Sequence, residues 1–232
     1  MIKIRRSDDR GHADHGWLKS KHTFSFADYH DPEHMAFRAL RVINEDWIEP
    51  GQGFGTHGHR DMEIISYVVS GGLEHKDSMG TGSVINAGDV QYMSAGSGVT
   101  HSEFNHSNSE QVHLLQIWIF PNEKSASPRY AQVHCRADEK RGDWKLIVSP
   151  KGEAGSIAIR QDAQLYARIL NAGEEASYSL SKDRFAWIQI VKGKLELGNE
   201  ALTKGDGVSI EAESILKLKA SETSEILLFD LP

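Results

Sequence analysis

The sequence predicts an all-β protein made of two similar β units in tandem. Short apolar runs of four to eight residues, separated by clusters of Gly, Asn, Asp and Ser, recur along nearly the whole chain, and helix signals are scarce. An internal repeat is the second observation, because three segments of the first half have counterparts in the same order in the second half. Runs of this length are typical of the strands of barrels and sandwiches.

Seven of the apolar runs illustrate the expected strands. Each is rich in Val, Ile, Leu or aromatic residues and is bounded by turn residues. They are residues 39–44, 63–69, 90–93, 113–120, 187–191, 207–210 and 225–229.

The repeat rests on three aligned pairs of segments. In the first pair, each copy consists of two expected strands joined by a turn that contains Gly. In the second pair, each copy contains a Gly-Asp turn. Residues 67–74 align with 189–196 at an offset of 122, residues 85–89 with 202–206 at an offset of 117, and residues 114–120 with 226–232.

We therefore expect an N-terminal β unit over residues 1–125, a connector over 126–159 and a C-terminal β unit over 160–232. The stretch 121–160 holds three prolines, mixed charges and the breaks at Gly152 and Gly155, which is typical of a connector with some local structure.

Composition describes an ordinary globular protein. Of 232 residues, 39% are apolar and 25% charged, which is enough to bury a core. The formal charge is −7 and the basic residues are interspersed with acids, so no basic stripe supports direct binding to nucleic acid.

The single cysteine, Cys135, excludes an internal disulfide and a metal site built from several thiolates, which fits a reducing compartment. The first residues lack an apolar signal segment, and no stretch reaches the ~18 apolar residues of a membrane span. We expect a cytoplasmic protein that does not enter a membrane.

Two pairs of metal-ligand residue types stand two positions apart. In an extended segment, alternation places His57, His59 and Glu63 on one face. His101 and Glu103 have the same spacing, a strand's length after the Gly-Asp turn at residues 88–89. Antiparallel strands of one small barrel can bring both pairs to a single ion, so the sequence predicts a metal site in the first unit.

The repeat supplies an internal control for this site. With the same offsets, His57 and His59 correspond to Ser179 and Ser181, and the pair at 101 and 103 corresponds to Leu218 and Ala220. The second unit has lost every ligand type, which indicates chemistry in the first unit alone.

These residues resemble the cupin superfamily, whose first motif G-x5-H-x-H-x3-E is present as Gly51, His57, His59 and Glu63. The second motif departs from the usual form, because Ser94-Ala95-Gly96 replaces Pro-x-Gly and four residues precede His101. The amino-acid sequence resembles that of pirin and its bacterial relatives at residues 22–29, 57–64, 75–78 and 94–103.

The resemblance implies a bicupin, with two jelly-roll β-barrels in tandem and one iron in the N-terminal barrel. It implies that the ligands are His57, His59, His101 and Glu103, and that the C-terminal barrel is free of metal. The residues themselves do not separate Glu63 from Glu103, and the same donors suit Zn, Mn, Ni, Cu or Co. Glu63 is then either a group that orients a ligand imidazole or a solvated strand carboxylate.

Other titratable residues are assigned to structure. His12, His15, His22, His30 and His34 are irregularly spaced, so capping and packing roles are expected. We interpret His75 and Asp77 as part of the turn that follows a strand, and Cys135 has no neighbour in sequence that lowers its pKa.

Three functions are compatible with the predicted metal site. The resemblance implies an iron-dependent dioxygenase of the quercetin 2,3-dioxygenase type, which opens a flavonol-like aromatic substrate with O₂ and releases carbon monoxide, with Glu103 as ligand and proton acceptor. A pirin-like iron module that regulates a protein partner through its redox state is the second. A Zn or Mn cupin acting as isomerase or decarboxylase is the third.

Overall fold

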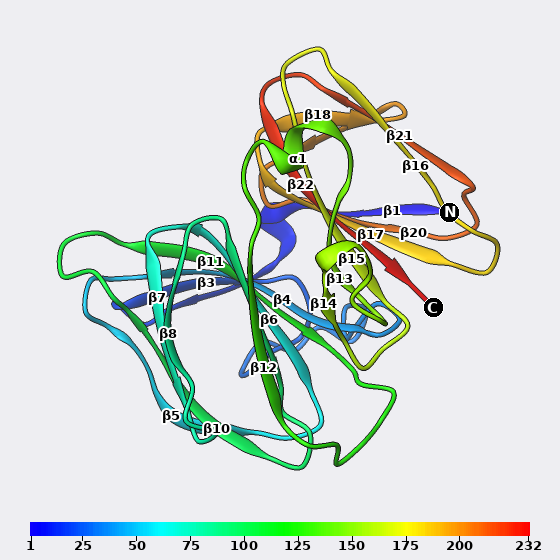
Figure 1. Ribbon diagram of the computed structural model, residues 1–232. Helices are drawn as coiled ribbons and strands as arrows, with labels where there is room; N and C mark the ends of the chain where they lie inside the picture. The colour runs from blue at the N-terminus through cyan, green and yellow to red at the C-terminus, as the bar shows by residue number, and fades with distance from the viewer.

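In the computed structural model, residues 11–134 form most of an N-terminal domain of two facing sheets (Figure 1). Its strands are β2 (Gly11–Asp14), β3 (Leu18–His22), β4 (Leu40–Ile48), β5 (Gly53–His59), β6 (Glu63–Ser70), β7 (Gly72–Asp77), β8 (Gly82–Asn86), β9 (Asp89–Ser94), β10 (Val99–Asn105), β11 (Val112–Ile119) and β12 (Arg129–His134). The order β12-β9-β6-β11-β4-β3-β2 makes a seven-stranded sheet, and β5-β10-β7-β8 a four-stranded sheet.

The C-terminal domain repeats this arrangement. Its strands are β1 (Ile2–Arg5), β13 (Lys145–Ser149), β14 (Ile157–Ala158), β15 (Gln164–Leu170), β16 (Glu175–Ser179), β17 (Phe185–Lys192), β18 (Lys194–Leu197), β19 (Glu200–Thr203), β20 (Gly207–Ile210), β21 (Ile215–Ala220) and β22 (Ser224–Leu231). Its sheets have the orders β1-β20-β17-β22-β15-β13-β14 and β16-β21-β18-β19.

Each domain is therefore a jelly-roll-like sandwich of two open sheets, and neither closes into a hydrogen-bonded barrel. Helical structure is confined to one four-residue α-helix, α1 (Glu139–Gly142), and two short 3₁₀ turns, Ser7–Asp9 and Glu153–Gly155. No helix is long and apolar enough to cross a membrane. The predicted all-β bicupin fold is confirmed.

The internal repeat is visible strand by strand, since β5 to β11 recur as β16 to β22 in the same order and with the same neighbours. Gly71 and Gly193 occupy the equivalent turns after β6 and β17, with φ of +78° and +84°. A Cβ at Gly193 would lie 2.4 Å from the Thr223 carbonyl oxygen, so both conformation and space require Gly there.

The register corrects the expected correspondence in the last part of the repeat. Glu103 lies opposite His75, whereas Leu218 lies opposite Leu197, which is His75 plus the offset of 122. Leu218 therefore corresponds to Glu103, and Leu216 to His101, two positions away from the alignment made on sequence. The conclusion is unchanged, because the second copy still carries no ligand at these positions.

The domain boundaries also differ from those expected. β1 pairs with β20 of the C-terminal domain, and β12 pairs with β9 of the N-terminal domain. β13 and β14 also lie within the expected connector, and both belong to the seven-stranded sheet of the C-terminal domain. Residues 126–159 thus extend one edge of each seven-stranded sheet, with β12 in the N-terminal domain and with β13 and β14 in the C-terminal domain.

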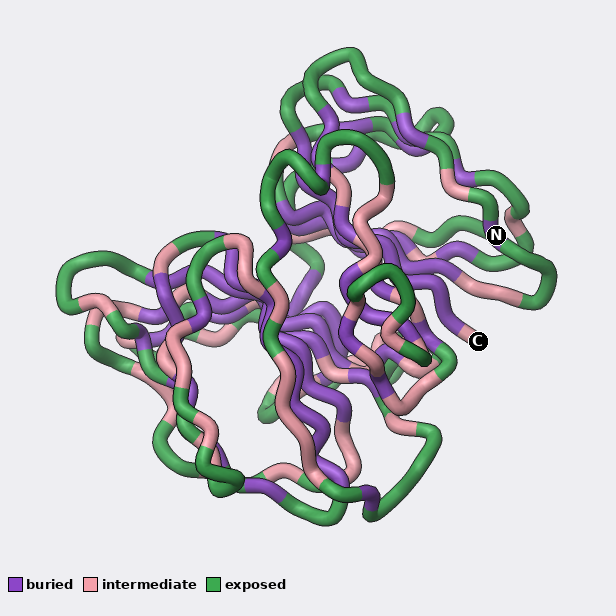
Figure 2. The backbone as a smooth tube through the Cα atoms, in the orientation of Figure 1, coloured by how far each residue is buried: buried purple, intermediate pink, exposed green.

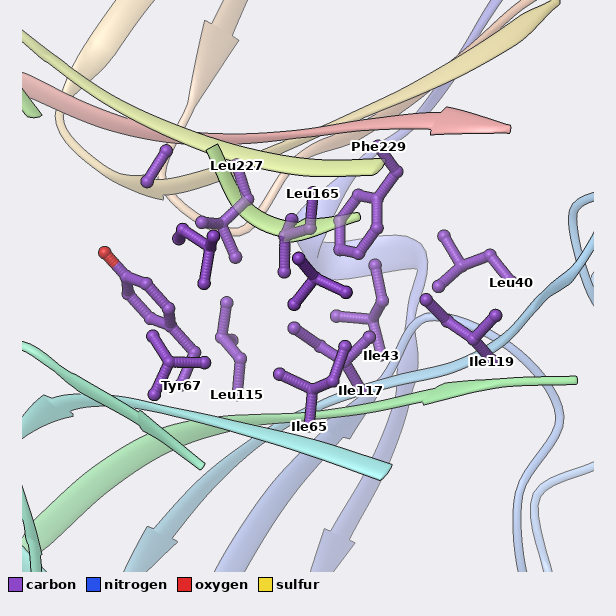
Figure 3. Packing of buried hydrophobic residues seen from close by; sticks show 14 of the residues in the cluster. Leu40, Ile43, Ile65, Tyr67, Leu115, Ile117, Ile119, Leu165, Leu227 and Phe229 are labelled. Atoms are coloured by element: carbon purple, nitrogen blue, oxygen red, sulfur yellow. The ribbon is translucent and has the colours of Figure 1, made fainter. Parts of the chain in front are cut away.

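The largest core lies between the two seven-stranded sheets, which face each other across the domain boundary (Figure 2). Ile65, Leu115 and Ile117 of the first domain contact the side that holds Leu165 and Phe229 of the second (Figure 3). Strands β6, β11, β17 and β22 are consequently buried on both faces and read as continuous apolar runs. The other face of the N-terminal sheet points into its own sandwich, where the candidate site lies.

Candidate metal centre

Strands β5 and β10 position the predicted ligands. They pair antiparallel in the four-stranded sheet, with His101 directly opposite His57 and Val99 opposite His59. Alternation along β10 turns His101 and Glu103 inward, where both are buried, while Thr100 and Phe104 are exposed. The register shifts between His101 and Glu103, and this irregularity lets two residues of β10 and two of β5 reach one interior region.

Three imidazoles converge there. The Nε2 atom of His101 lies 3.1 Å from Nε2 of His57 and 3.0 Å from Nε2 of His59. Two nitrogens that bind one ion at ~2.1 Å and a right angle are separated by about 3.0 Å. Both separations are therefore those of adjacent ligands of a single divalent ion, and the ligand atoms of all three histidines lie within 4.8 Å of one another.

The hydrogen-bonding and charge state of the rings suits metal binding. His57 Nδ1 lies 2.8 Å from the Gly55 carbonyl oxygen, so it donates and leaves the Nε2 lone pair free. Burial, followed by the neighbouring imidazoles, lowers the pKa of His59 to about 4 and that of His101 to about 3. Both rings are neutral at pH 7, which is the form that binds metals.

Glu103 lies beside this triad. Its carboxylate accepts hydrogen bonds from Gln116 Nε2 at 2.9 Å and from Ser66 Oγ at 3.3 Å. Ligand atoms of His57, His59 and His101 lie within 4.8 Å of one another, and a second set within that limit contains His75, His101 and Glu103. The structure thus brings the three histidines together and places Glu103 next to His101.

The site opens into a cavity of about 590 Å³ in the N-terminal sandwich. His57, His59 and Glu103 line it, while His101 is 1% exposed and lies behind them. Its lining combines apolar, largely aromatic residues with polar ones, so the cavity suits a ligand with both flat apolar and hydrogen-bonding parts. The apolar residues include Leu18, Phe26, Phe54 and Trp118, and the polar ones include Ser20, His22, Asn44, Asp46 and Gln116.

Glu63 does not orient a ligand imidazole and is not solvated. It begins β6, in the other sheet, because the chain turns after His59 and Asp61 takes φ of +49°. Its carboxylate is 1% exposed and accepts hydrogen bonds from Tyr92, Ser94 and the backbone N–H of Arg160. Glu63 ties the first domain to the segment between β14 and β15.

Histidines at two places near the site were expected from the sequence to have structural roles only. His12, His15 and His22 line the cavity, although their spacing gave no sign of it. His75, interpreted as a turn residue, is fully buried and its Nδ1 lies 3.4 Å from His101 Nδ1. The spacing of His75 two residues before Asp77 is the signal that could have found it.

Cys135 is 1% exposed in the shared core, and burial raises its pKa to about 11. The thiolate form that reacts with oxidants is therefore suppressed. This agrees with the absence of pKa-lowering neighbours in the sequence and removes the thiol as a redox-sensing group.

Comparisons with known proteins agree with the fold. The family model described as Pirin matches residues 3–119, and the model described as Quercetinase C-terminal cupin domain matches residues 146–231. A protein of Escherichia coli K12 named quercetin 2,3-dioxygenase is 49% identical over 232 residues, covering 100% of this chain and 99% of the relative. A pirin-like protein of Caulobacter vibrioides is 40% identical, covering 99% of each.

Among solved structures, the bacterial pirin YhhW of Escherichia coli in complex with nickel(II) superposes with a TM-score of 0.96 at 47% identity, covering 100% of this chain and 99% of that one. The YhaK protein of the same organism gives a TM-score of 0.77 at 31% identity, covering 96% of this chain and 98% of that one. With matches that span both domains, this chain belongs to the pirin family.

Proposed function

We propose that this protein is a dioxygenase of the quercetin 2,3-dioxygenase type, with one Fe(II) held by His57, His59, His101 and Glu103. The observation that carries the proposal is the convergence of three imidazole nitrogens beside a cavity of about 590 Å³, which His57 and His59 line. That volume lies within the range of small-molecule sites, about 300–1,000 Å³. The names of the Escherichia coli relatives, one a quercetin 2,3-dioxygenase and one a nickel(II) complex, support it.

The donor set supports one divalent ion per chain. Three neutral imidazoles and one carboxylate leave one or two positions open in five- or six-fold coordination. The C-terminal domain has Tyr178, Leu216 and Leu218 at the corresponding positions, so we propose that it binds none. Tyr178 lies opposite Leu216 as His57 lies opposite His101. Iron is proposed from the type of reaction, since the same donors also suit Zn, Mn, Ni, Cu and Co.

When bound, the ion supplies a Lewis acid for a substrate hydroxyl and redox chemistry with O₂. Glu103 accepts the proton of that hydroxyl, and the hydrogen bonds from Gln116 and Ser66 keep its carboxylate facing the site. Phe26 and Trp118, whose rings meet edge to face at 5.3 Å, both line the cavity and offer aromatic contacts to the rings of a flavonol. The occupants of the cavity are thus a small aromatic substrate and O₂.

The experiment separates ligand and base roles at Glu103. The Glu103→Gln variant keeps an oxygen donor but loses charge and basicity, so iron content should largely remain while flavonol-dependent oxygen uptake falls by about 10²–10⁴. Glu110→Gln, at an exposed carboxylate in the loop after β10, is the control and should behave as wild type. Iron content and oxygen-electrode traces are measured on the same samples.

Two results would count against the proposal. Unchanged oxygen uptake in Glu103→Gln refutes the role of the carboxylate as base. No uptake by iron-loaded wild type with any flavonol of a panel refutes the dioxygenase, and favours the iron module that regulates a protein partner.

A further inference from the structure

A second histidine lies behind the triad, on the strand next to β10. β7 pairs with β10 so that His75 is opposite Glu103 and Asp77 opposite His101. The side chains of His75 and Asp77 are both 0% exposed. His75 does not line the cavity, so its contacts are with the protein alone.

The hydrogen bonds around His75 have a defined direction. Asp77 Oδ2 lies 3.0 Å from His75 Nε2, and a carboxylate can only accept, so Nε2 carries the proton. In the neutral ring Nδ1 then presents a lone pair. Two N–H groups share this lone pair, because Gln91 Nε2 lies 3.2 Å and His101 Nδ1 3.4 Å from His75 Nδ1.

His101 needs such an acceptor if it binds a metal. Its Nε2 faces His57 and His59, so in a neutral metal-bound ring the proton is on Nδ1. His101 is 1% exposed, and His75 Nδ1 is the nearest acceptor that the structure gives this N–H. Without it, a buried donor would be left unpaired or the ring would turn.

The second copy of the repeat shows that packing alone does not require a histidine here. Leu197 corresponds to His75 and lies opposite Leu218, which corresponds to Glu103. Both leucines are buried in the core of the C-terminal domain. A position that changes together with the ligands is tied to the site.

We propose that His75, held by Asp77, is a positioning residue that fixes the tautomer and orientation of His101 for the metal. The inference rests on the metal centre of the proposed function and adds a carboxylate–histidine–histidine chain behind it. Partners of this kind that orient metal-bound histidines affect metal affinity by about 10–100-fold.

The test compares His75→Asn with His75→Leu. The two side chains have nearly the same shape, and Asn offers Oδ1 where histidine has Nδ1, whereas Leu has no acceptor. Nickel(II) binding to metal-free full-length protein is measured by titration calorimetry. We expect the Leu variant to bind about 10–100-fold more weakly than the Asn variant, with Asn close to wild type.

A second variant, Asp77→Asn, guards against poor folding of the first two. Its Oδ1 still accepts from the Met79 and Thr81 amides, which preserves the turn, while Nδ2 donates to His75 Nε2 and moves the ring proton to Nδ1. We expect the same loss of nickel affinity with an unchanged unfolding midpoint of the metal-free protein. His134→Leu, in the exposed His134–Asp89 pair, is the control and should bind nickel as wild type does.

Equal nickel affinities for His75→Asn and His75→Leu, with wild type binding one ion, overturn the inference and leave the proposed function standing. So does Asp77→Asn with wild-type affinity. Wild type that takes up no nickel refutes the metal centre itself, and the inference with it.

Discussion

Asp46 is a carboxyl group in the cavity wall whose ionisation the fold opposes. It is 4% exposed, and its carboxyl group accepts a hydrogen bond from the Ser20 hydroxyl. Burial raises its pKa from 3.8 to about 7, the Ser20 hydrogen bond acts against this rise, and the charges of Glu103 and Glu45 add to it. Replacing it by Asn keeps the shape and removes the ionisation.

The raised pKa of Asp46 determines how the stability of the fold changes with pH. Stability associated with Asp46 is fully present below pH 3.8, where the unfolded chain is also protonated, and is lost as the pH rises to 7. The loss grows by about 1.4 kcal/mol per pH unit and reaches at most about 4 kcal/mol. The Asp46→Asn variant does not ionise at this position and avoids the loss. Its free energy of unfolding relative to wild type should therefore increase by about 2–3 kcal/mol between pH 5 and pH 8.

Urea unfolding of the metal-free protein at the two pH values measures this advantage, because the free energy of unfolding is extrapolated linearly from the transition. Asp28→Asn is the matched control, since Asp28 lines the same cavity but is exposed. An advantage of Asp46→Asn that stays constant or shrinks from pH 5 to pH 8 would refute the reasoning.

Three further results are expected. Residues 1–125 alone should not give a stable folded protein, because Ile65 and Leu115 would lose their partners across the domain boundary; a cooperative unfolding transition of the fragment would contradict this. Phe229→Ala should destabilise the full chain by about 3–5 kcal/mol in urea unfolding, because the ring is 0% exposed in the shared core; a loss below about 1 kcal/mol would argue against tight packing there. Cys135 should react with a thiol reagent only on unfolding, and rapid labelling of the native protein would contradict its burial.

Local sequence patterns were sufficient to predict the fold class. They were also sufficient to predict that the two pairs of candidate ligands lie close together. Alternation along β10 predicted that His101 and Glu103 face one way, and the interior placement confirms it. The turn glycines Gly71 and Gly193 marked the repeat, because both need positive φ at equivalent positions.

Features that depend on pairing between distant segments could not be predicted. Which sheet edge takes β1 or β12 is a choice between edges that the sequence of the strand does not specify. The extended run expected from His57 to Glu63 breaks because Asp61 adopts positive φ, which sends Glu63 to the other sheet.

The role of His75 was hidden for a similar reason. The spacing of His75 and Asp77 before a turn is ordinary turn chemistry, and Asp77 does bind the Met79 and Thr81 amides. Its second oxygen holds His75, and only the register of β7 against β10 brings that ring to His101. Cross-strand register is not visible in a single sequence.

Anomalous diffraction from crystals of metal-loaded protein shows directly where the ion binds. We expect one peak per chain, about 2.0–2.2 Å from Nε2 of His57, His59 and His101 and from a Glu103 oxygen. A peak elsewhere, or a second peak in the C-terminal domain, would contradict it.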